Sequence, residues 1–263
     1  MADVTVNVAP YFLYDFPEIP IPEMLSKVED TKADGIEFAL LGDPDIDTIL
    51  PRLDDTGLQL GLLLSGDGDP VSKPNLTKPD ESRSAAAALR TDIEHAERLG
   101  CDDIAVLVGP NVPDHTMSDQ IQAIADILRE VAPKVSNAGI SLHVEPVCRT
   151  ASSDYLLKTI SLAADVVQRV DHPRVGILYD IYHQQMTDGR ILETFLSHAD
   201  LISYLHVANV PDRSPPNEGE LAVDYIVAEI LDAGYDGPIG CEFVDCHNGV
   251  DSVDRFYEFV DGI

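Results

Sequence analysis

The stretch Val175–His183 has the sequence Val-Gly-Ile-Leu-Tyr-Asp-Ile-Tyr-His and decides the fold that we expect for this chain. It begins as a short, mostly apolar run, which predicts a buried β-strand. It ends with Asp180 and His183, whose side chains can bind a metal ion or move a proton. An apolar strand with ionisable side chains at its C-terminal end is typical of the mouth of an α/β barrel.

Three other predicted strands in the second half of the chain repeat this pattern. Each is a short apolar run with an ionisable side chain near its C-terminal end, and successive candidates are separated by about one strand–helix unit. Because the C-terminal ends of barrel strands lie at one mouth, we expect these side chains to converge. The strands and their ionisable residues are Ile140–Val147 with Glu145, Leu201–Val210 with His206, and Pro238–Val244 with Glu242.

Strand-like and helix-like stretches alternate along the chain, which predicts an α/β fold, a (β/α)8 TIM barrel that forms a single domain over residues 1–263. An open doubly wound sheet is the alternative, but it needs a glycine-rich turn after its first strand, and Val4–Phe16 contains no glycine. The other predicted strands are Val4–Ala9, Gly35–Leu41, Leu58–Leu64 and Asp103–Val108. The predicted helices are Pro22–Thr31, Ile46–Asp55, Glu81–Leu99, Met117–Asn137, Ser153–Val170, Arg190–Ala199, Ala222–Ala233 and Val253–Val260.

The chain is strongly acidic, with 17 basic and 47 acidic residues and a net charge of −30. The basic residues are scattered, so we expect neither nucleic acid nor a membrane surface as a partner. Such a surface is tolerated where salt shortens the Debye length, to about 3 Å at 1 M. The composition therefore predicts a protein of a high-salt, halophilic cytosol, and an ordinary acidic enzyme is the alternative.

Two further features favour a cytoplasmic location. No run of 18 or more apolar residues occurs, and the N-terminal residues show no basic segment followed by an apolar one, so we expect no membrane span and no export signal. The four cysteines form no Cys-x-x-Cys pair, which indicates reduced thiols. We interpret Cys148 and Cys241, which lie near candidate site residues, as small buried hydrophobic side chains.

The four strand-end residues form a mixed set of oxygen and nitrogen donors. Such a set suits Mn, Mg, Co or Fe(II), with Zn also possible, and we predict one divalent metal ion bound by Glu145, Asp180, His206 and Glu242. The ion would bind the carbonyl oxygen and adjacent hydroxyl of a small sugar-like substrate, and Glu145 and Glu242 would act as catalytic base and acid. The predicted reaction is isomerisation or epimerisation of an α-hydroxy carbonyl compound through an enediolate.

Other polar residues are candidates for supporting roles. His183 and Arg213 are expected to bind oxygen atoms of the substrate. Glu37, near the end of the second predicted strand, is a weaker candidate, and His143 is expected to be packed or to support a metal ligand. The segment Ser65–Pro79 is too long for a simple connection and is expected to be a lid or a mobile loop. Three basic residues near it are expected to be solvated: Lys73, Lys78 and Arg83.

At these residues the chain resembles the xylose isomerase-like barrel superfamily of sugar isomerases and epimerases, most strongly from about residue 140 onward. The segment Leu178–Met186 resembles the Tyr-Asp-Ile-Tyr-His segment of the hydroxypyruvate isomerase branch. The other similar segments are Val210–Arg213, Gly219–Leu221 and Gly234–Glu242. The resemblance implies the same roles as the residues themselves do. The metal ligands would be Glu145, Asp180, His206 and Glu242, with the two glutamates as acid and base. The substrate-binding residues would be His183 and Arg213. His206 departs from this branch, which often has Gln there, and matches the ketose epimerase relatives.

Several alternatives stay open at this point. A ketose or an inosose could be the substrate, and the same site could serve a lyase of the inosose dehydratase type. A non-catalytic sugar-binding barrel is a second alternative. A DNA-repair endonuclease, which another branch of the superfamily represents, would need more histidines at the mouth and a basic face, and the net charge of −30 counts against it. The chain is also a possible homo-oligomer.

Overall fold

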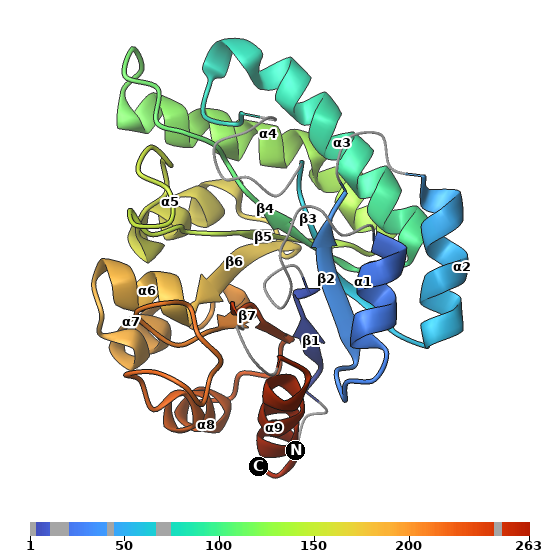
Figure 1. The fold of residues 1–263 in the computed structure, drawn as a ribbon. Coiled ribbons are helices and arrows are strands. Elements are labelled where there is room, and N and C mark those ends of the chain that lie inside the picture. The colour runs from blue at the N-terminus through green and yellow to red at the C-terminus, as the bar shows by residue number, and fades with distance from the viewer. Residues whose placement is uncertain (1–3, 11–20, 41–44, 67–74, 245–248) are drawn as a thin grey trace.

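The computed structural model describes residues 4–10, 21–40, 45–66, 75–244 and 249–263. Eight parallel strands close into a barrel in the order of the sequence, which confirms the predicted (β/α)8 architecture (Figure 1). The strands are β1 (Val6–Val8), β2 (Gly35–Ala39), β3 (Gln59–Leu64), β4 (Asp103–Val106), β5 (Ser141–Val144), β6 (Val175–Asp180), β7 (Ile202–Val207) and β8 (Ile239–Cys241).

Helices surround the barrel on the outside (Figure 1). They are α1 (Ile21–Val28), α2 (Ile46–Thr56), α3 (Ser82–Leu99), α4 (Met117–Ala138), α5 (Ile160–Val170), α6 (Ile181–Thr187), α7 (Ile191–His198), α8 (Val223–Asp232) and α9 (Gly249–Asp261), with a short 3-10 turn, η2 (Pro79–Glu81), before α3. Glycines end two of them: Gly57 after α2 and Gly100 after α3 have φ of 72° and 69°, a left-handed conformation that glycine adopts without a Cβ clash.

The predicted helix Ser153–Val170 is wrong over its first turns, because α5 begins only at Ile160. The preceding segment pairs instead with the loops that follow β4 and β5. The Leu156 N–H donates to the carbonyl of Gly109, and the Tyr155 ring is buried, with its hydroxyl donating to the Glu145 carbonyl over 2.9 Å. Burial of this tyrosine therefore overrides the local helix signal.

The stretch at Val175–His183 contains a boundary that the sequence pattern did not predict. Strand β6 ends at Asp180, and the short helix α6 begins at the next residue. Asp180 is the N-cap of this helix, since its Oδ1 accepts the His183 N–H over 3.1 Å. One carboxylate thus ends a strand and begins a helix, which fixes His183 in the first turn beside it.

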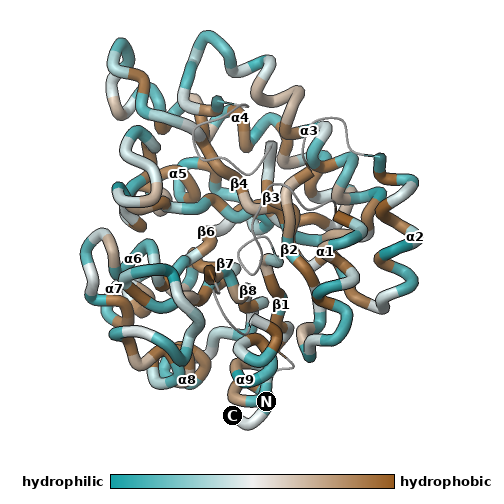
Figure 2. The backbone as a smooth tube through the Cα atoms, in the orientation of Figure 1, coloured by the Kyte–Doolittle hydropathy of each residue, from teal (hydrophilic) through white to brown (hydrophobic). Residues whose placement is uncertain are grey.

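Most of the hydrophobic core lies between the strands and the inner faces of the helices, where Figure 2 shows the hydrophobic residues gathered. A smaller cluster fills part of the barrel interior and consists of Ala39, Leu62, Leu64, Ala105, Leu178 and Tyr204. Within the described ranges, none of the helices is long and apolar enough to cross a membrane.

The predicted lid can be followed only in part, because residues 67–74, including Lys73, lie outside the described residues. Its C-terminal end is held to the barrel: the Leu76 N–H donates to the Val108 carbonyl over 2.9 Å, and the Thr77 hydroxyl donates to the Pro110 carbonyl over 2.6 Å. Lys78 pairs with Glu81 at 3.0 Å near the surface, and Arg83 is exposed, in line with solvated positions.

Candidate metal centre

The four predicted ligands come together at the C-terminal mouth of the barrel. Glu145, Asp180, His206 and Glu242 each offer a ligand atom, these atoms lie within 4.8 Å of one another, and all four side chains are buried. Strand register explains part of this convergence. Asp180 on β6 lies directly beside His206 on β7, and Glu242 follows Cys241, the register partner of Val207 on β7.

Backbone contacts fix the two glutamates at the strand ends. The Glu145 N–H donates to the carbonyl of Val106, and the Glu145 carbonyl receives the Tyr155 hydroxyl. The Glu242 N–H donates to Val207 over 3.2 Å, and the Glu242 carbonyl accepts from Arg213 Nε over 3.1 Å. In each glutamate, both the backbone N–H and the backbone carbonyl are therefore held by hydrogen bonds. Such a fixed backbone suits a preorganised site.

The imidazole of His206 lies between two carboxylates. Its Nδ1 is 2.7 Å from Glu242 Oε2, and its Nε2 is 3.0 Å from Glu37 Oε2. Both ring nitrogens are buried and lie within ion-pair distance of these carboxylates, but neither contact has the geometry of a hydrogen bond. A buried imidazole that shares a cluster with three buried carboxylates, without hydrogen bonds to satisfy its nitrogens, fits a divalent cation.

The two glutamates experience opposite electrostatic surroundings. Burial and the negative charge of Glu242 raise the pKa of Glu145 above its usual range. Burial acts in the same direction on Glu242, but Arg213 and His206 outweigh it and lower the pKa of that carboxyl below its usual range. Two carboxyl groups whose pKa values are pushed apart are typical of an acid and base pair.

Arg213 bridges two members of the cluster. Its Nη2 donates to Asp180 Oδ2 over 2.9 Å and also donates to Glu242 Oε2. Its backbone has a φ of 56°, in the left-handed region that non-glycine residues seldom adopt, and its guanidinium lies over the Tyr182 ring at 5.2 Å. Strained backbone held by tertiary contacts is frequent where a side chain must be aimed at a functional site.

His183 lies beside the cluster rather than within it. Its Nε2 is 3.7 Å from Glu145 Oε1 and 3.6 Å from Asp180 Oδ2, and its Nδ1 contacts Cys148 Sγ at 3.2 Å. Burial lowers the pKa of His183 to about 4, so the ring is neutral near pH 7. A neutral imidazole can donate or accept a hydrogen bond to a substrate oxygen.

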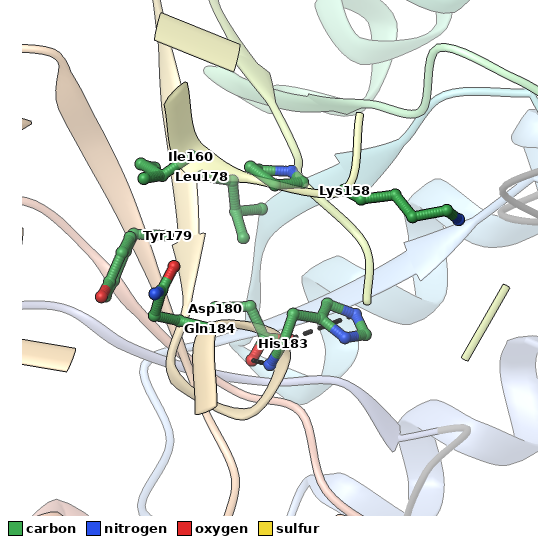
Figure 3. A pocket seen from close by; sticks show the side chains of 8 residues that line it. Lys158, Ile160, Leu178, Tyr179, Asp180, His183 and Gln184 are labelled. Atoms are coloured by element: carbon green, nitrogen blue, oxygen red, sulfur yellow. Dashed lines mark hydrogen bonds and ion pairs between the residues drawn. The ribbon is translucent and has the colours of Figure 1, made fainter. Parts of the chain in front are cut away.

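A small cavity lies next to Asp180 and His183. Figure 3 shows these two side chains together at its wall, while Lys158 extends away from both. The cavity measures about 10 Å³, close to the space that one water molecule needs. It can therefore hold a water molecule behind the cluster, but not a substrate.

The two weaker candidates lie deeper in the barrel. His143 bonds Ser203 Oγ through Nδ1 and Asp103 Oδ1 through Nε2, both at 2.7 Å, and Asp103 begins β4. His143 is thus packed toward the N-terminal end of the barrel, as one of its two expected roles requires. Glu37 is buried against His206. The sequence pattern carries no sign of the support that Tyr155 gives to Glu145, because it places Tyr155 in the first turn of the predicted helix Ser153–Val170.

The chain is similar to known proteins along most of its length. A family model described as xylose isomerase-like TIM barrel matches residues 25–256. The chain is 30% identical to the hydroxypyruvate isomerase of Escherichia coli (strain K12), over 80% of this chain and 82% of that protein. It is 25% identical to the 2-oxo-tetronate isomerase of Pectobacterium atrosepticum, over 87% of this chain and 88% of that protein.

Solved structures share the fold, and two of them serve as examples. A protein described as AP endonuclease, family 2, from Brucella melitensis superposes with a TM-score of 0.86 at 24% identity, over 98% of this chain and 99% of that one. D-allulose 3-epimerase from Methylomonas sp. gives a TM-score of 0.80 at 17% identity, over 100% of this chain and 98% of that one. At such identities these structures support the fold alone.

Proposed function

Because this chain belongs to the xylose isomerase-like TIM barrel family, we propose that it is a divalent-metal-dependent isomerase or epimerase of a small α-hydroxy carbonyl compound. The observation that carries the proposal is the buried cluster of three carboxylates and one imidazole at the barrel mouth. Relatives named hydroxypyruvate isomerase and 2-oxo-tetronate isomerase cover most of the chain and support this class of reaction. Ketose substrates belong to the same chemical class.

The cluster would hold Mn, Mg or Co through Glu145, Asp180, His206 and Glu242, and Zn is a further candidate. When bound, the ion would polarise the substrate carbonyl and so acidify the neighbouring C–H bond. Glu145 and Glu242, which follow β5 and β8, would act as base and acid. They would remove the proton from one carbon and return it either to the adjacent carbon, in an isomerisation, or to the opposite face of the same carbon, in an epimerisation.

Two further side chains would orient the substrate. Arg213 keeps its charge at any working pH and would bind a substrate carboxylate or hydroxyl oxygen while it bridges Asp180 and Glu242. His183, neutral because burial lowers its pKa to about 4, would hydrogen-bond a second oxygen. Both contacts act on substrate atoms next to the carbon that loses its proton.

The proposal predicts loss of turnover in two variants. Glu145→Gln and Glu242→Gln keep the shape of each side chain but remove its basicity, so each should lower turnover by at least about 10²–10⁴-fold, the usual contribution of a proton-transferring group. Glu97→Gln, on the exposed face of α3, is the matched control. Wild-type rates in either site variant, with an unchanged circular dichroism spectrum, would reject the proposal.

The substrate can be identified through the carbon that loses its proton. The Mn²⁺-loaded protein would be incubated in D2O with hydroxypyruvate, tartronate semialdehyde, 2-oxo-tetronate, simple ketoses and inososes. Mass spectrometry and NMR should show deuterium at a carbon next to the carbonyl of the true substrate class. Loss of water from an inosose would instead favour a lyase, and no exchange with any compound would favour a binding protein.

A further inference from the structure

Glu37 is a buried carboxylate that the proposed reaction does not use directly. It lies in β2 and is 0% exposed. Its Oε1 accepts the Tyr204 hydroxyl over 2.6 Å, and that hydroxyl accepts from Asn7 Nδ2 over 2.7 Å. Residues from β1, β2 and β7 thus form one chain of hydrogen bonds inside the barrel, and this chain fixes the orientation of the Glu37 carboxylate.

Glycines make room for this polar chain. A Cβ at Gly240 on β8 would lie 2.3 Å from Glu37 Oε1 and 2.6 Å from His206 Cδ2, and a Cβ at Gly61 on β3 would lie 2.3 Å from the Asn7 side chain. Any larger residue at either position would displace these hydrogen-bonded side chains. The barrel wall therefore leaves space at Gly240 for the Glu37 carboxylate and the His206 imidazole in close contact, and at Gly61 for the Asn7 side chain.

The second oxygen of Glu37 faces the candidate metal centre through His206. Glu37 Oε2 lies 3.0 Å from His206 Nε2, and the opposite ring nitrogen, Nδ1, lies 2.7 Å from Oε2 of Glu242, another residue of the cluster. In the described part of the chain, the basic group within ion-pair distance of Glu37 is this imidazole. Burial of a carboxylate is unfavourable unless a partner offsets it, so we expect Glu37 and His206 to act together.

We propose that Glu37 is a positioning residue that holds the Nε2 side of His206 through their close contact, directs Nδ1 toward a bound cation and thereby sets the affinity of the centre. The inference rests on the proposed function, because it needs a cation at the cluster. Carboxylates that hold the second nitrogen of a ligating histidine fix the ring and its tautomer, and their loss typically weakens metal binding about 10–100-fold. The hydrogen bond from Tyr204 makes this carboxylate rigid.

Binding of Mn²⁺ alone, followed by the electron paramagnetic resonance signal of the free ion, tests the inference. Glu37→Gln should weaken binding about 10–100-fold. Tyr204→Phe keeps the charge but removes one hydrogen bond to Glu37, so roughly 2–10-fold weaker binding is expected. Asp103→Asn is the matched control, because it removes the carboxylate that faces the other interior histidine, His143. It should leave Mn²⁺ affinity at the wild-type value.

The outcomes separate this inference from the proposed function. Wild-type Mn²⁺ affinity in both Glu37→Gln and Tyr204→Phe would overturn the positioning role while leaving the metal centre intact. Equal weakening in Asp103→Asn would also overturn it, since the effect would then come from any interior carboxylate. Failure of the wild-type protein to bind Mn²⁺ would overturn both proposals. Thermal unfolding of the metal-free variants checks that folded proteins are compared.

Discussion

At the scale of single residues, the candidate site is an excess of negative charge held together by few positive groups. Three carboxylates converge within a buried volume, and Glu37 adds a fourth behind His206. Arg213 and the His206 ring are the positive or protonatable groups that contact these acids most closely. Repulsion among buried carboxylates is relieved either by protons or by a cation, and these two should therefore compete.

This competition predicts that metal binding releases protons. Burial lowers the pKa of His206, but Glu242 and Glu37 outweigh burial and raise that pKa well above its usual value, while burial and Glu242 raise the pKa of Glu145. The metal-free site thus holds protons that a cation must displace, so Mn²⁺ affinity should rise as pH rises through neutrality. Calorimetric titrations in two buffers of different ionisation enthalpy measure the number released, and equal heats would contradict the prediction.

Arg213 should matter more for turnover than for metal binding. Its guanidinium donates to Asp180 and Glu242, and hydrogen bonds between charged groups contribute about 1.5–3 kcal/mol each. Arg213→Ala should lower kcat/KM roughly 10–100-fold, yet it should not weaken Mn²⁺ binding, because it removes a positive charge beside the cation. Arg213→Lys keeps the positive charge and should therefore lower kcat/KM less than Arg213→Ala does. A parallel loss of Mn²⁺ affinity would mean that Arg213 builds the cluster instead.

At the scale of elements, the segment between β5 and α5 connects packing to the site. Tyr155 receives the Val108 N–H over 3.0 Å and donates to the Glu145 carbonyl over 2.9 Å, so one buried hydroxyl ties the loops after β4 and β5 together. This segment fails to begin the predicted helix at Ser153, because its backbone groups and its tyrosine find partners elsewhere. The backbone at Glu145, just after β5, is therefore held by the non-helical segment around Tyr155 and not by the first turn of a helix.

Loss of this hydroxyl should destabilise the fold. Tyr155→Phe leaves a buried N–H and a buried carbonyl without their partner, which should lower the free energy of unfolding by about 1–3 kcal/mol. Urea unfolding followed by circular dichroism measures this change. Tyr225→Phe on α8 is the matched control, since that side chain is 58% exposed. Equal midpoints for the two variants would contradict the role given to Tyr155.

At the scale of the whole molecule, the net charge of −30 is the dominant feature. Several acidic residues form ion pairs at the surface, among them Glu258 with Lys32, Asp47 with Arg98 and Glu94 with Lys134. Such pairs stabilise a protein by at most about 1 kcal/mol each. Repulsion among unpaired acidic residues should therefore outweigh them, and salt should screen that repulsion more than it weakens the pairs.

Salt should consequently stabilise the protein. An increase from 0.1 M to 1 M KCl shortens the Debye length from about 10 Å to about 3 Å. We expect Tm to rise by at least about 4 °C, the shift that roughly 1–2 kcal/mol produces in a chain of this size. The increment should shrink near pH 4.5, where part of the carboxylates become protonated. A fall in Tm with KCl at pH 7 would contradict this prediction and the expected adaptation to salt.

The sequence by itself determined the barrel and the positions of Glu145, Asp180, His206 and Glu242 at strand ends. Apolar runs, helix periodicity and closing glycines are local signals, and parallel topology brings the C-terminal ends of all strands to one mouth. For that reason, the sequence alone assigns residues scattered over the second half of the chain to one cluster.

Only the tertiary structure decided which side chains touch inside and around that mouth. The contact of Glu37 with His206, the bridge from Arg213 to Asp180, the burial of Tyr155 and the N-cap of α6 depend on strand register, on space left by glycines and on packing across the barrel. These contacts join residues far apart in the chain, and a local pattern specifies which face of an element is buried, not which distant atom it meets.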